Sequence, residues 1–390
     1  MLHNESLHYL DHAATTMVHP QVAQMVYDTL CQNWANPSSL YQPGYESRQL
    51  LDKARAAVAK TLGAPAQQVF FTGCGTEGNN IAIQGALKVR RSWASNVVVS
   101  GYEHPSVSAV LRQMEQDGWE IRTILPDSEG HLSIEDFVSA TDKQTALVCC
   151  MQVNNEIGSV VDVNQLARRV KEKNPRTGVH VDGVQAWLRM PVSMEYIDSY
   201  TVSGHKVHAP KGIGALYLRE GYHIQPPFAG GGQEKGKTAG QQQGVRPGTE
   251  NLAYAVGLAK AAALGYKSSQ ERWNRVAGLN RQLRQGLKEI PGLVFNSPED
   301  AVPEVLNVST MCIKSETMLH FLEQRQIYVS SGSACSKGAS SPTLQAMGAS
   351  ALRMDTALRI SLGAENTSQD IQAVVDGIRE GMQTLAKISG

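Results

Sequence analysis

Lys206 and Asp182 are the two residues whose types and positions most directly suggest catalysis. Each follows a short apolar run, residues 179–181 before Asp182 and residues 200–203 before the segment Gly-His-Lys that ends at Lys206. A lysine amine can form a Schiff base with a carbonyl compound, and a pyridoxal phosphate site needs such a lysine together with a carboxylate for the pyridinium nitrogen. The structural alternatives are a solvated lysine at a loop end and a helix-capping aspartate. The pair favours a cofactor site, because ligands of open α/β sheets bind at the carboxyl ends of the strands.

Two further segments could complete such a site. Residues 72–77, TGCGTE, follow an apolar run and open a helical one, so their backbone N–H groups could hold a phosphate. Similar strand–glycine–helix turns also occur for structural reasons alone. Cys335 lies in the small, polar segment SSGSACSKGA (330–339), where Lys337 would favour the nucleophilic thiolate. The alternative is an incidental surface thiol.

Residues 231–238, GGQEKGKT, match the phosphate-loop pattern G-x-x-x-x-G-K-[ST] and suggest an ATPase. That site requires a buried strand before the loop and a helix that begins at its Lys-Thr pair, here Lys237 and Thr238. The preceding PPFA and the following AGQQQGVRPG favour neither element. Nucleotide binding at this segment is therefore disfavoured.

The elements that must position these residues alternate along the chain. Two helices are expected first, at 20–33 and 43–62. β-branched runs that predict strands follow at 69–72, 97–100, 146–153, 179–182, 200–203 and 215–218. Helical segments alternate with them at 76–90, 105–117 and 163–173. This alternation predicts an α/β fold with a mostly parallel sheet covered on both faces. The remainder predicts a loop over 226–250, one long helix over 251–290, and a smaller α+β domain with strands at 305–310, 327–330 and 357–361 and a helix after Asn366.

Composition narrows the class of protein. The 390 residues include 36 Lys+Arg and 36 Asp+Glu, so neutrality gives no general attraction to nucleic acid or an anionic membrane. Six cysteines, of which Cys149 and Cys150 are neighbours in an apolar run, are too few for a disulfide framework and suggest a reducing compartment. We find no signal peptide pattern and no apolar stretch of bilayer length. We therefore expect a cytoplasmic protein without a nucleic-acid or membrane partner.

Short segments distributed over nearly the whole chain carry a resemblance to a known family. In order they are YLDHAATT (9–16), NPSSLYQPG (36–44), FTGCGTEGNN (71–80), EHPSV (103–107), VNNEIG (153–158), HVDGVQA (180–186), SGHKVHAPKGIGALY (203–217), RPGTEN (246–251), SSGSACSKG (330–338) and LRISLGAENT (358–367). With them the sequence closely resembles the cysteine desulfurases of the NifS/IscS type. These are class V aminotransferase-like members of the fold-type I pyridoxal-phosphate enzymes.

The resemblance implies roles for the residues that would do the chemistry. Lys206 would bind pyridoxal 5'-phosphate covalently, and Asp182 would pair with the pyridinium nitrogen. His104 would stack on the cofactor ring and help to move protons, while Gln185 would bond the phenolic oxygen. Cys335 would accept the sulfur of L-cysteine as a persulfide.

The resemblance also implies a set of binding residues. The phosphate would be held by Gly75, Thr76, Ser203 and His205, with Thr249 contributed by the other subunit of a homodimer. The substrate carboxylate would be bound by Asn155, which would also lie beside the cofactor, and by Arg359 through a bidentate pair of hydrogen bonds. No metal is implied.

The implied function is conversion of L-cysteine to L-alanine. Sulfur would pass from Cys335 to an acceptor protein for iron–sulfur cluster assembly, thio-cofactor synthesis or tRNA thiolation. The implied architecture is a large cofactor-binding domain over 16–260 with a seven-stranded sheet, and a small α+β domain from 1–15 and 261–390 that carries the cysteine loop. The alternatives are a selenocysteine lyase or another β-eliminating enzyme of the same fold, and a catalytically silent sulfur carrier.

Four positions depart from the residues common in that family, namely Met17, Cys74, Leu188 and Ala209. None of them removes a functional group that the implied reaction needs. The segment after Cys335 is also less typical, which leaves the identity of the sulfur acceptor open.

Overall fold

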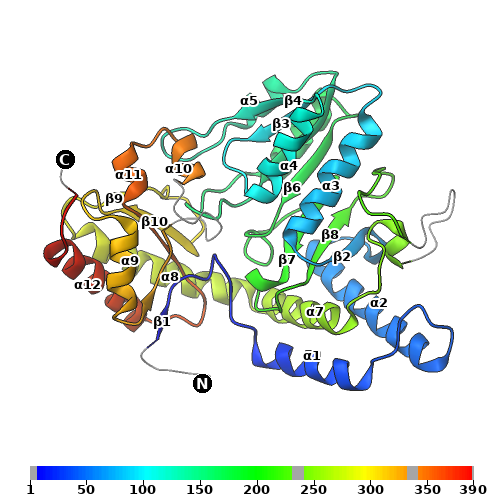
Figure 1. Ribbon diagram of the computed structural model, residues 1–390, viewed down its shortest axis with the longest axis horizontal. Coiled ribbons are helices and arrows are strands. Elements are labelled where there is room, and N and C mark those ends of the chain that lie inside the picture. The colour runs from blue at the N-terminus through cyan, green and yellow to red at the C-terminus, as the bar shows by residue number, and fades with distance from the viewer. Residues whose placement is uncertain (1–6, 231–240, 332–340, 389–390) are drawn as a thin grey trace.

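One seven-stranded sheet forms the centre of the computed structural model, which describes residues 7–230, 241–331 and 341–388 (Figure 1). Its strands are β2 (Val69–Thr72), β3 (Asn96–Ser100), β4 (Glu120–Ile124), β5 (Thr145–Met151), β6 (Gly178–Asp182), β7 (Ser199–Ser203) and β8 (Gly214–Leu218). They lie in the order β2-β8-β7-β6-β5-β3-β4. Only β8 runs antiparallel to its neighbours. The mostly parallel sheet expected from the sequence is confirmed.

Helices cover both faces of this sheet. On one face lie α3 (Gly75–Arg90) and α4 (Pro105–Gln116), and on the other lie α2 (Gln42–Leu62), α5 (Ile134–Ala140), α6 (Val163–Lys173) and α7 (Leu252–Lys267). α1 (Pro20–Gln32) packs on α7. Because both faces are covered, every residue of β5 is buried, with Cys149 facing one layer and Cys150 the other.

A smaller α+β part lies beside the large sheet, on the left in Figure 1. Its three-stranded antiparallel sheet has β10 (Val305–Ser309) between β9 (Val294–Phe295) and β12 (Ala357–Ser361), and β1 (His8–Tyr9) pairs in parallel with β11 (Ile327–Tyr328). The accompanying helices are α8 (Ser269–Lys288), α9 (Ser315–Glu323), α10 (Pro342–Ala346), α11 (Ala351–Asp355) and α12 (Ser368–Thr384). This part has its own hydrophobic core, to which Leu10 contributes.

The structure corrects the expected long helix over 251–290. α7 and α8 are separate helices that meet at Ser268, whose backbone lies outside the helical region and whose hydroxyl donates to Leu264 O. The sequence also gave no sign of β4, an edge strand in which only Ile124 is buried. Such a strand lacks the apolar run that marks its neighbours.

The sequence predicts no nucleotide site at the phosphate-loop match and no membrane-spanning segment. The phosphate-loop match at 231–238 lies outside the described residues, and the last strand before it, β8, ends at Leu218. Within the described ranges, every helix is too short or too polar to cross a bilayer.

The carboxyl ends of six strands, all but β8, lie at one edge of the large sheet, and five of these ends, those of β2, β3, β5, β6 and β7, bear on the site. β3, β5, β6 and β7 are mutually parallel, and β2 shares their direction because both β2 and β7 are antiparallel to β8. The turns after these strands contain the segments that the sequence singles out for chemistry. In open α/β sheets this edge is where ligands bind.

Gly183 directly follows β6 and lies in a tightly packed position at this edge. A Cβ there would lie 1.9 Å from Cζ of Tyr200, which is fully buried. We expect Gly183→Ala to lower the free energy of unfolding by about 1–3 kcal/mol, because the strand end or the ring must move. Urea unfolding measures this change.

The matched control is Gly278→Ala in α8. A Cβ at Gly278 meets only the Arg281 guanidinium, at 3.9 Å, and alanine favours a helix. We expect this variant to be neutral or slightly more stable than the wild type. An equal loss of stability in both variants would contradict the packing described for Gly183.

Candidate functional site

One cavity of about 200 Å³ at this edge brings together residues from all five strand ends. Ten of the predicted site residues line it, namely Gly75, Thr76, His104, Asn155, Asp182, Gln185, Ser203, His205, Lys206 and Arg359. Thr249 is exposed and is not part of the lining. Cys335 lies outside the described residues, so its predicted role stays a prediction.

The N-terminus of α3 forms one end of the cavity. Cys74 is the residue before the helix, and its side chain makes no capping hydrogen bond. The N–H groups of Gly75 and Thr76, in the first turn, therefore receive no cap from that side chain. A Cβ on Gly75 would lie 2.9 Å from Val184 Cγ2 and 3.5 Å from Ser203 Cβ, so glycine permits this close approach. Exposed N–H groups and the helix dipole make this end suited to a phosphate.

His205 also lines the cavity. Its Nδ1 lies 3.2 Å from Thr15 Oγ1. Burial, reinforced by the charge of Lys206, lowers the pKa of His205 to about 4. His205 is therefore neutral near pH 7, and the attraction for an anion comes from the helix N-terminus and from Lys206.

Asp182 lies at the carboxyl end of β6 and is 4% exposed. Its Oδ1 accepts the Val184 N–H at 2.9 Å, and its Oδ2 accepts Asn79 Nδ2–H at 2.8 Å. A carboxylate has about four acceptor positions. Asp182 is thus held in one orientation and can still accept a hydrogen bond from a group in the cavity.

Lys206 ends the short 3-10 helix η2 (Gly204–Lys206) that follows β7. Its Nζ donates to Ala13 O at 2.6 Å and to Ala14 O at 2.7 Å. Gln185 Nε2 also donates to Ala13 O, at 2.9 Å. The segment after β1 therefore closes the cavity over the amine and over the amide.

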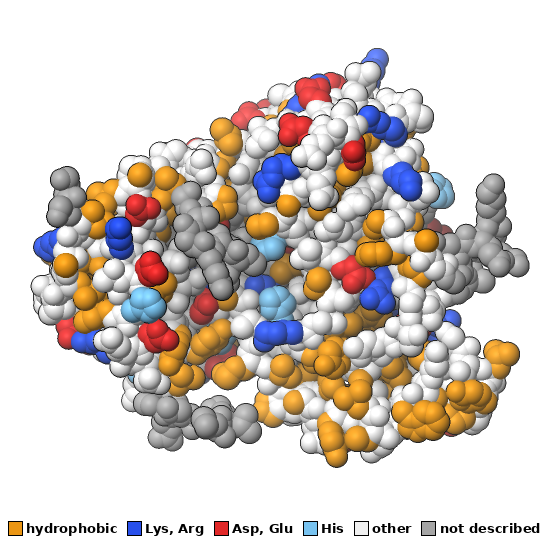
Figure 2. Space-filling view, in the orientation of Figure 1, with side chains coloured by type: hydrophobic (Ala, Val, Ile, Leu, Met, Phe, Trp, Pro, Cys, Tyr) orange, Lys and Arg blue, Asp and Glu red, His pale blue; other side chains and the backbone are white. Residues whose placement is uncertain are grey.

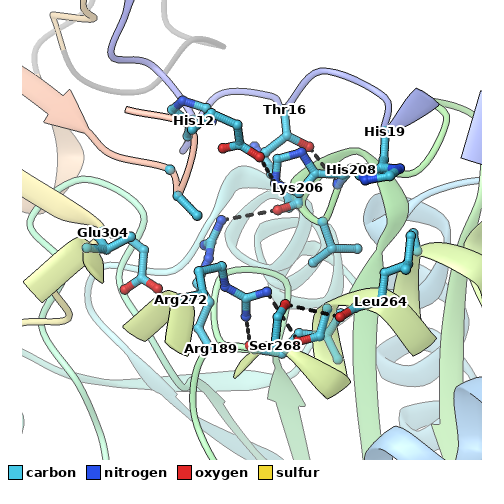
Figure 3. A pocket seen from close by; sticks show the side chains of 18 of the residues that line it. His12, Thr16, His19, Arg189, Lys206, His208, Leu264, Ser268, Arg272 and Glu304 are labelled. Carbon is cyan, nitrogen blue, oxygen red and sulfur yellow. Dashed lines mark hydrogen bonds and ion pairs between the residues drawn. The ribbon is translucent and has the colours of Figure 1, made fainter. Parts of the chain in front are cut away.

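Arg189, to which the sequence assigns no role, fixes Gln185 and Lys206 from behind. Its Nη1 donates to Gln185 Oε1 at 2.6 Å and its Nη2 to Lys206 O at 3.1 Å. Figure 3 shows Arg189 and Lys206 from a second cavity of about 540 Å³ that they share as a wall. Because a guanidinium only donates, it holds Oε1 of Gln185, and the amide N–H that does not bond to Ala13 O can donate into the first cavity.

Arg359, in β12, is 1% exposed and crosses from the smaller part to the cavity. Its Nη2 donates to Asp11 Oδ1 at 2.8 Å and its Nη1 to Asn155 O at 3.1 Å, while its Nε has no hydrogen-bond partner among the described residues. Burial raises the pKa of Asp11, and the Arg359 charge offsets part of this rise. A guanidinium can donate two parallel hydrogen bonds to a carboxylate, and in this structure Arg359 donates to the carboxylate of Asp11.

Comparison with known proteins identifies relatives along the whole chain. The model of the aminotransferase class-V family matches residues 8–374. A cysteine desulfurase of Nostoc sp. is 36% identical over 98% of this chain and 95% of its own length, and the cysteine desulfurase IscS of Clostridium botulinum is 34% identical over 94% and 92%. A solved NifS-like protein superposes with a TM-score of 0.89 at 32% identity, covering 97% of this chain and 99% of that one.

The Asp11–Arg359 ion pair should contribute to stability, because the Arg359 side chain is only 1% exposed and Asp11 is the carboxylate that it contacts, at 2.8 Å. We expect Asp11→Asn to lower the free energy of unfolding by about 3 kcal/mol, since it leaves a buried guanidinium without its counter-charge. Chemical unfolding of the two proteins measures the difference.

Glu380→Gln is the matched control, because Glu380 pairs with Arg325 at 2.6 Å on the surface. An exposed pair contributes less than about 1 kcal/mol. A loss from Asp11→Asn no larger than that of the control would show that Asp11 does not balance the Arg359 charge.

Proposed function

The chain belongs to the class-V aminotransferase family and is a pyridoxal-phosphate-dependent cysteine desulfurase, and we propose that Lys206, Asp182 and Arg359 carry this reaction. The observation that most supports these roles is that one cavity contains an amine, a buried carboxylate and a buried guanidinium at separate places. L-cysteine and the cofactor together need these three groups.

The donor set of the lining fits pyridoxal phosphate. The N-terminus of α3 would hold the phosphate, and Asp182 would accept a hydrogen bond from the ring nitrogen. Gln185, whose Oε1 is already bonded to Arg189, would donate to the phenolic oxygen, and Lys206 would provide the covalent link. When bound, the cofactor supplies an electron sink that stabilises negative charge at the substrate Cα.

The protein's own groups would orient the substrate and move its proton. Arg359 would bind the carboxylate of L-cysteine, since its Nε has no hydrogen-bond partner in the part of the chain that the structure describes, while Nη1 and Nη2 donate to Asn155 O and Asp11 Oδ1. This contact would direct Cα–H towards Lys206, whose Nζ would take the proton. The segment containing Ala13 and Ala14 would keep water from the amine.

Cys335 would receive the sulfur. Its thiolate would attack the substrate Sγ, so an S–S bond forms while the Cβ–S bond breaks and its electron pair remains on the carbon fragment. Protonation of that fragment gives L-alanine, and the sulfur remains on Cys335 as a persulfide. The segment around Cys335 is rich in glycine and serine, which suits a nucleophile that must approach both a substrate and an acceptor protein.

Cys335→Ala tests this assignment. We expect the variant to keep its visible cofactor absorbance but to lose sulfur transfer from L-cysteine to a thiol acceptor, because alanine cannot attack sulfur. Mass analysis of the wild-type peptide should show one added sulfur atom on Cys335. Cys312→Ala, which removes a partly exposed thiol in the smaller part of the molecule, is the control and should retain full activity. Normal turnover by Cys335→Ala would instead favour a selenocysteine lyase or another β-eliminating enzyme.

An exposed hydrophobic surface supports a homodimer. Of the fifteen large hydrophobic side chains that are exposed among the described residues, nine lie between residues 17 and 45: Met17, Val18, Met25, Tyr27, Leu30, Trp34, Leu40, Tyr41 and Tyr45. Figure 2 shows hydrophobic side chains gathered at the bottom, over α1 and the adjoining end of α2. Such a surface is typical of an interface. We propose that a second copy covers it, and that Thr249 of each subunit reaches the phosphate of the other.

The double variant Tyr27→Lys, Leu30→Lys tests the dimer. Both side chains are in α1 and are 64% and 58% exposed. Burying one large hydrophobic side chain contributes about 1.5–3 kcal/mol, so we expect the dissociation constant to rise at least about tenfold. Analytical ultracentrifugation measures it. Leu125→Lys, at a residue 62% exposed outside this surface, is the control. A wild-type dimer that the double variant leaves intact would exclude this interface.

Three further predictions remain part of the proposal. The acceptor is a protein of iron–sulfur cluster assembly, thio-cofactor synthesis or tRNA thiolation, and the enzyme works in the cytoplasm. The division into domains at 16–260 and at 1–15 with 261–390 is supported by the separate core that Leu10 shares with the C-terminal part.

A further inference from the structure

A buried amide connects the two side chains that flank the cofactor position. Asn79, in α3, is fully buried, and its Nδ2 donates to Asp182 Oδ2 and to Ser106 Oγ, both at 2.8 Å. Ser106 Oγ in turn lies 2.8 Å from His104 Nδ1. Asp182 and His104 are therefore joined through two residues, Asn79 and Ser106.

The charge of Asp182 fixes the direction of this hydrogen-bond chain. A carboxylate only accepts, so the amide nitrogen of Asn79 must face it and Oδ1 must face the other way. That oxygen lies 3.1 Å from His180 Nε2, which must therefore carry a proton. His180 Nδ1, 2.9 Å from Ser199 Oγ, then accepts the hydroxyl proton. Burial lowers the pKa of His180 to about 3, which agrees with one proton on its ring.

The other end of the chain fixes the proton of His104. The Ser106 backbone N–H donates to His104 Nδ1 at 3.1 Å, as His104 caps the N-terminus of α4. A backbone N–H can only donate, so Nδ1 presents its lone pair. Ser106 Oγ accepts from Asn79 and can donate its own proton to the same Nδ1. The neutral imidazole therefore carries its proton on Nε2.

The surroundings also favour the neutral ring. Burial lowers the pKa of His104; the Asp182 charge opposes this shift and the Lys206 charge adds to it. His205, the other nearby imidazole, is neutral near pH 7. Protonating His104 at Nδ1 would break the bonds from both donors of Ser106.

We propose that Asn79 is a positioning residue that determines both the orientation of Asp182 and the tautomer of His104. It holds the Asp182 carboxylate in place directly, and through Ser106 it keeps the His104 proton on Nε2. His104 then hydrogen-bonds a group in the cavity and does not take the substrate α-proton, because its only basic nitrogen faces Ser106. That leaves Lys206 as the base. The place of this chain in the reaction rests on the proposed function, but its geometry does not.

The test follows the histidine protons directly in the holoenzyme. The protein contains 11 histidines, so ¹⁵N-histidine labelling with His104→Gln for assignment resolves the His104 ring by NMR. We expect Nε2 protonated and Nδ1 unprotonated in the wild type near pH 7. A proton on Nδ1 would overturn the proposal.

Two variants break the chain at different points. Asn79→Leu should abolish the single His104 tautomer and shift the pH titration of the cofactor absorbance by about one unit, because Asp182 loses a donor. Ser106→Ala keeps the backbone N–H but removes the hydroxyl, so the Nε2–H tautomer should remain while the titration midpoint of His104 rises. It keeps the proposal testable if Asn79→Leu does not fold.

The control is Asn80→Leu, the same change one residue along α3. Among the described residues, the Asn80 amide donates to Thr76 O and accepts from Gln84 Nε2. This variant should change neither the tautomer, nor the titration midpoint of His104, nor the absorbance titration. If Asn79→Leu or Ser106→Ala behaves like this control, Asn79 has no positioning role. Failure of the proposed function would appear differently, as the absence of alanine formation from L-cysteine in a protein whose His104 tautomer is as described.

Discussion

The Asp182 carboxylate is only 4% exposed, and the site is organised around it. Burying an isolated carboxylate is costly unless donors surround it. The Val184 N–H and the Asn79 amide supply two donors, and the orientation that Asn79 must adopt then determines which way its neighbours donate. One buried charge thus sets the geometry of the region that would face the cofactor ring.

The segment after β1 connects this region to the smaller part of the molecule. Asp11 pairs with Arg359, and the carbonyls of Ala13 and Ala14 accept from Gln185 and Lys206. Groups proposed to bind the substrate and the cofactor therefore share one backbone segment. Arg189 holds Gln185 and Lys206 from the opposite side. The amine, the amide and the guanidinium are therefore positioned by contacts between segments that lie far apart in the sequence.

Much of this arrangement follows from local sequence patterns. Apolar runs predict the central strands, and Asp182 and Lys206 fall at their carboxyl ends because parallel strands end at one edge. The roles of Asp11, Asn79 and Arg189 could not be predicted in that way. Asp11 meets Arg359 across 348 positions of sequence, and no periodicity reports such a contact. Asn79 and Asp11 do lie within the segments FTGCGTEGNN and YLDHAATT, but only folding shows what their side chains touch. The break at Ser268 and the exposed strand β4 lack a strong local signal as well.

The central claim is that one cavity converts L-cysteine to L-alanine through Lys206. The most direct measurement is to incubate the purified protein, loaded with pyridoxal phosphate, with L-cysteine and to quantify alanine and transferable sulfur together. The account predicts equal amounts of the two from the wild type and none from Lys206→Ala. Release of pyruvate and ammonia instead of alanine, or alanine formation that survives the loss of Lys206, would contradict it.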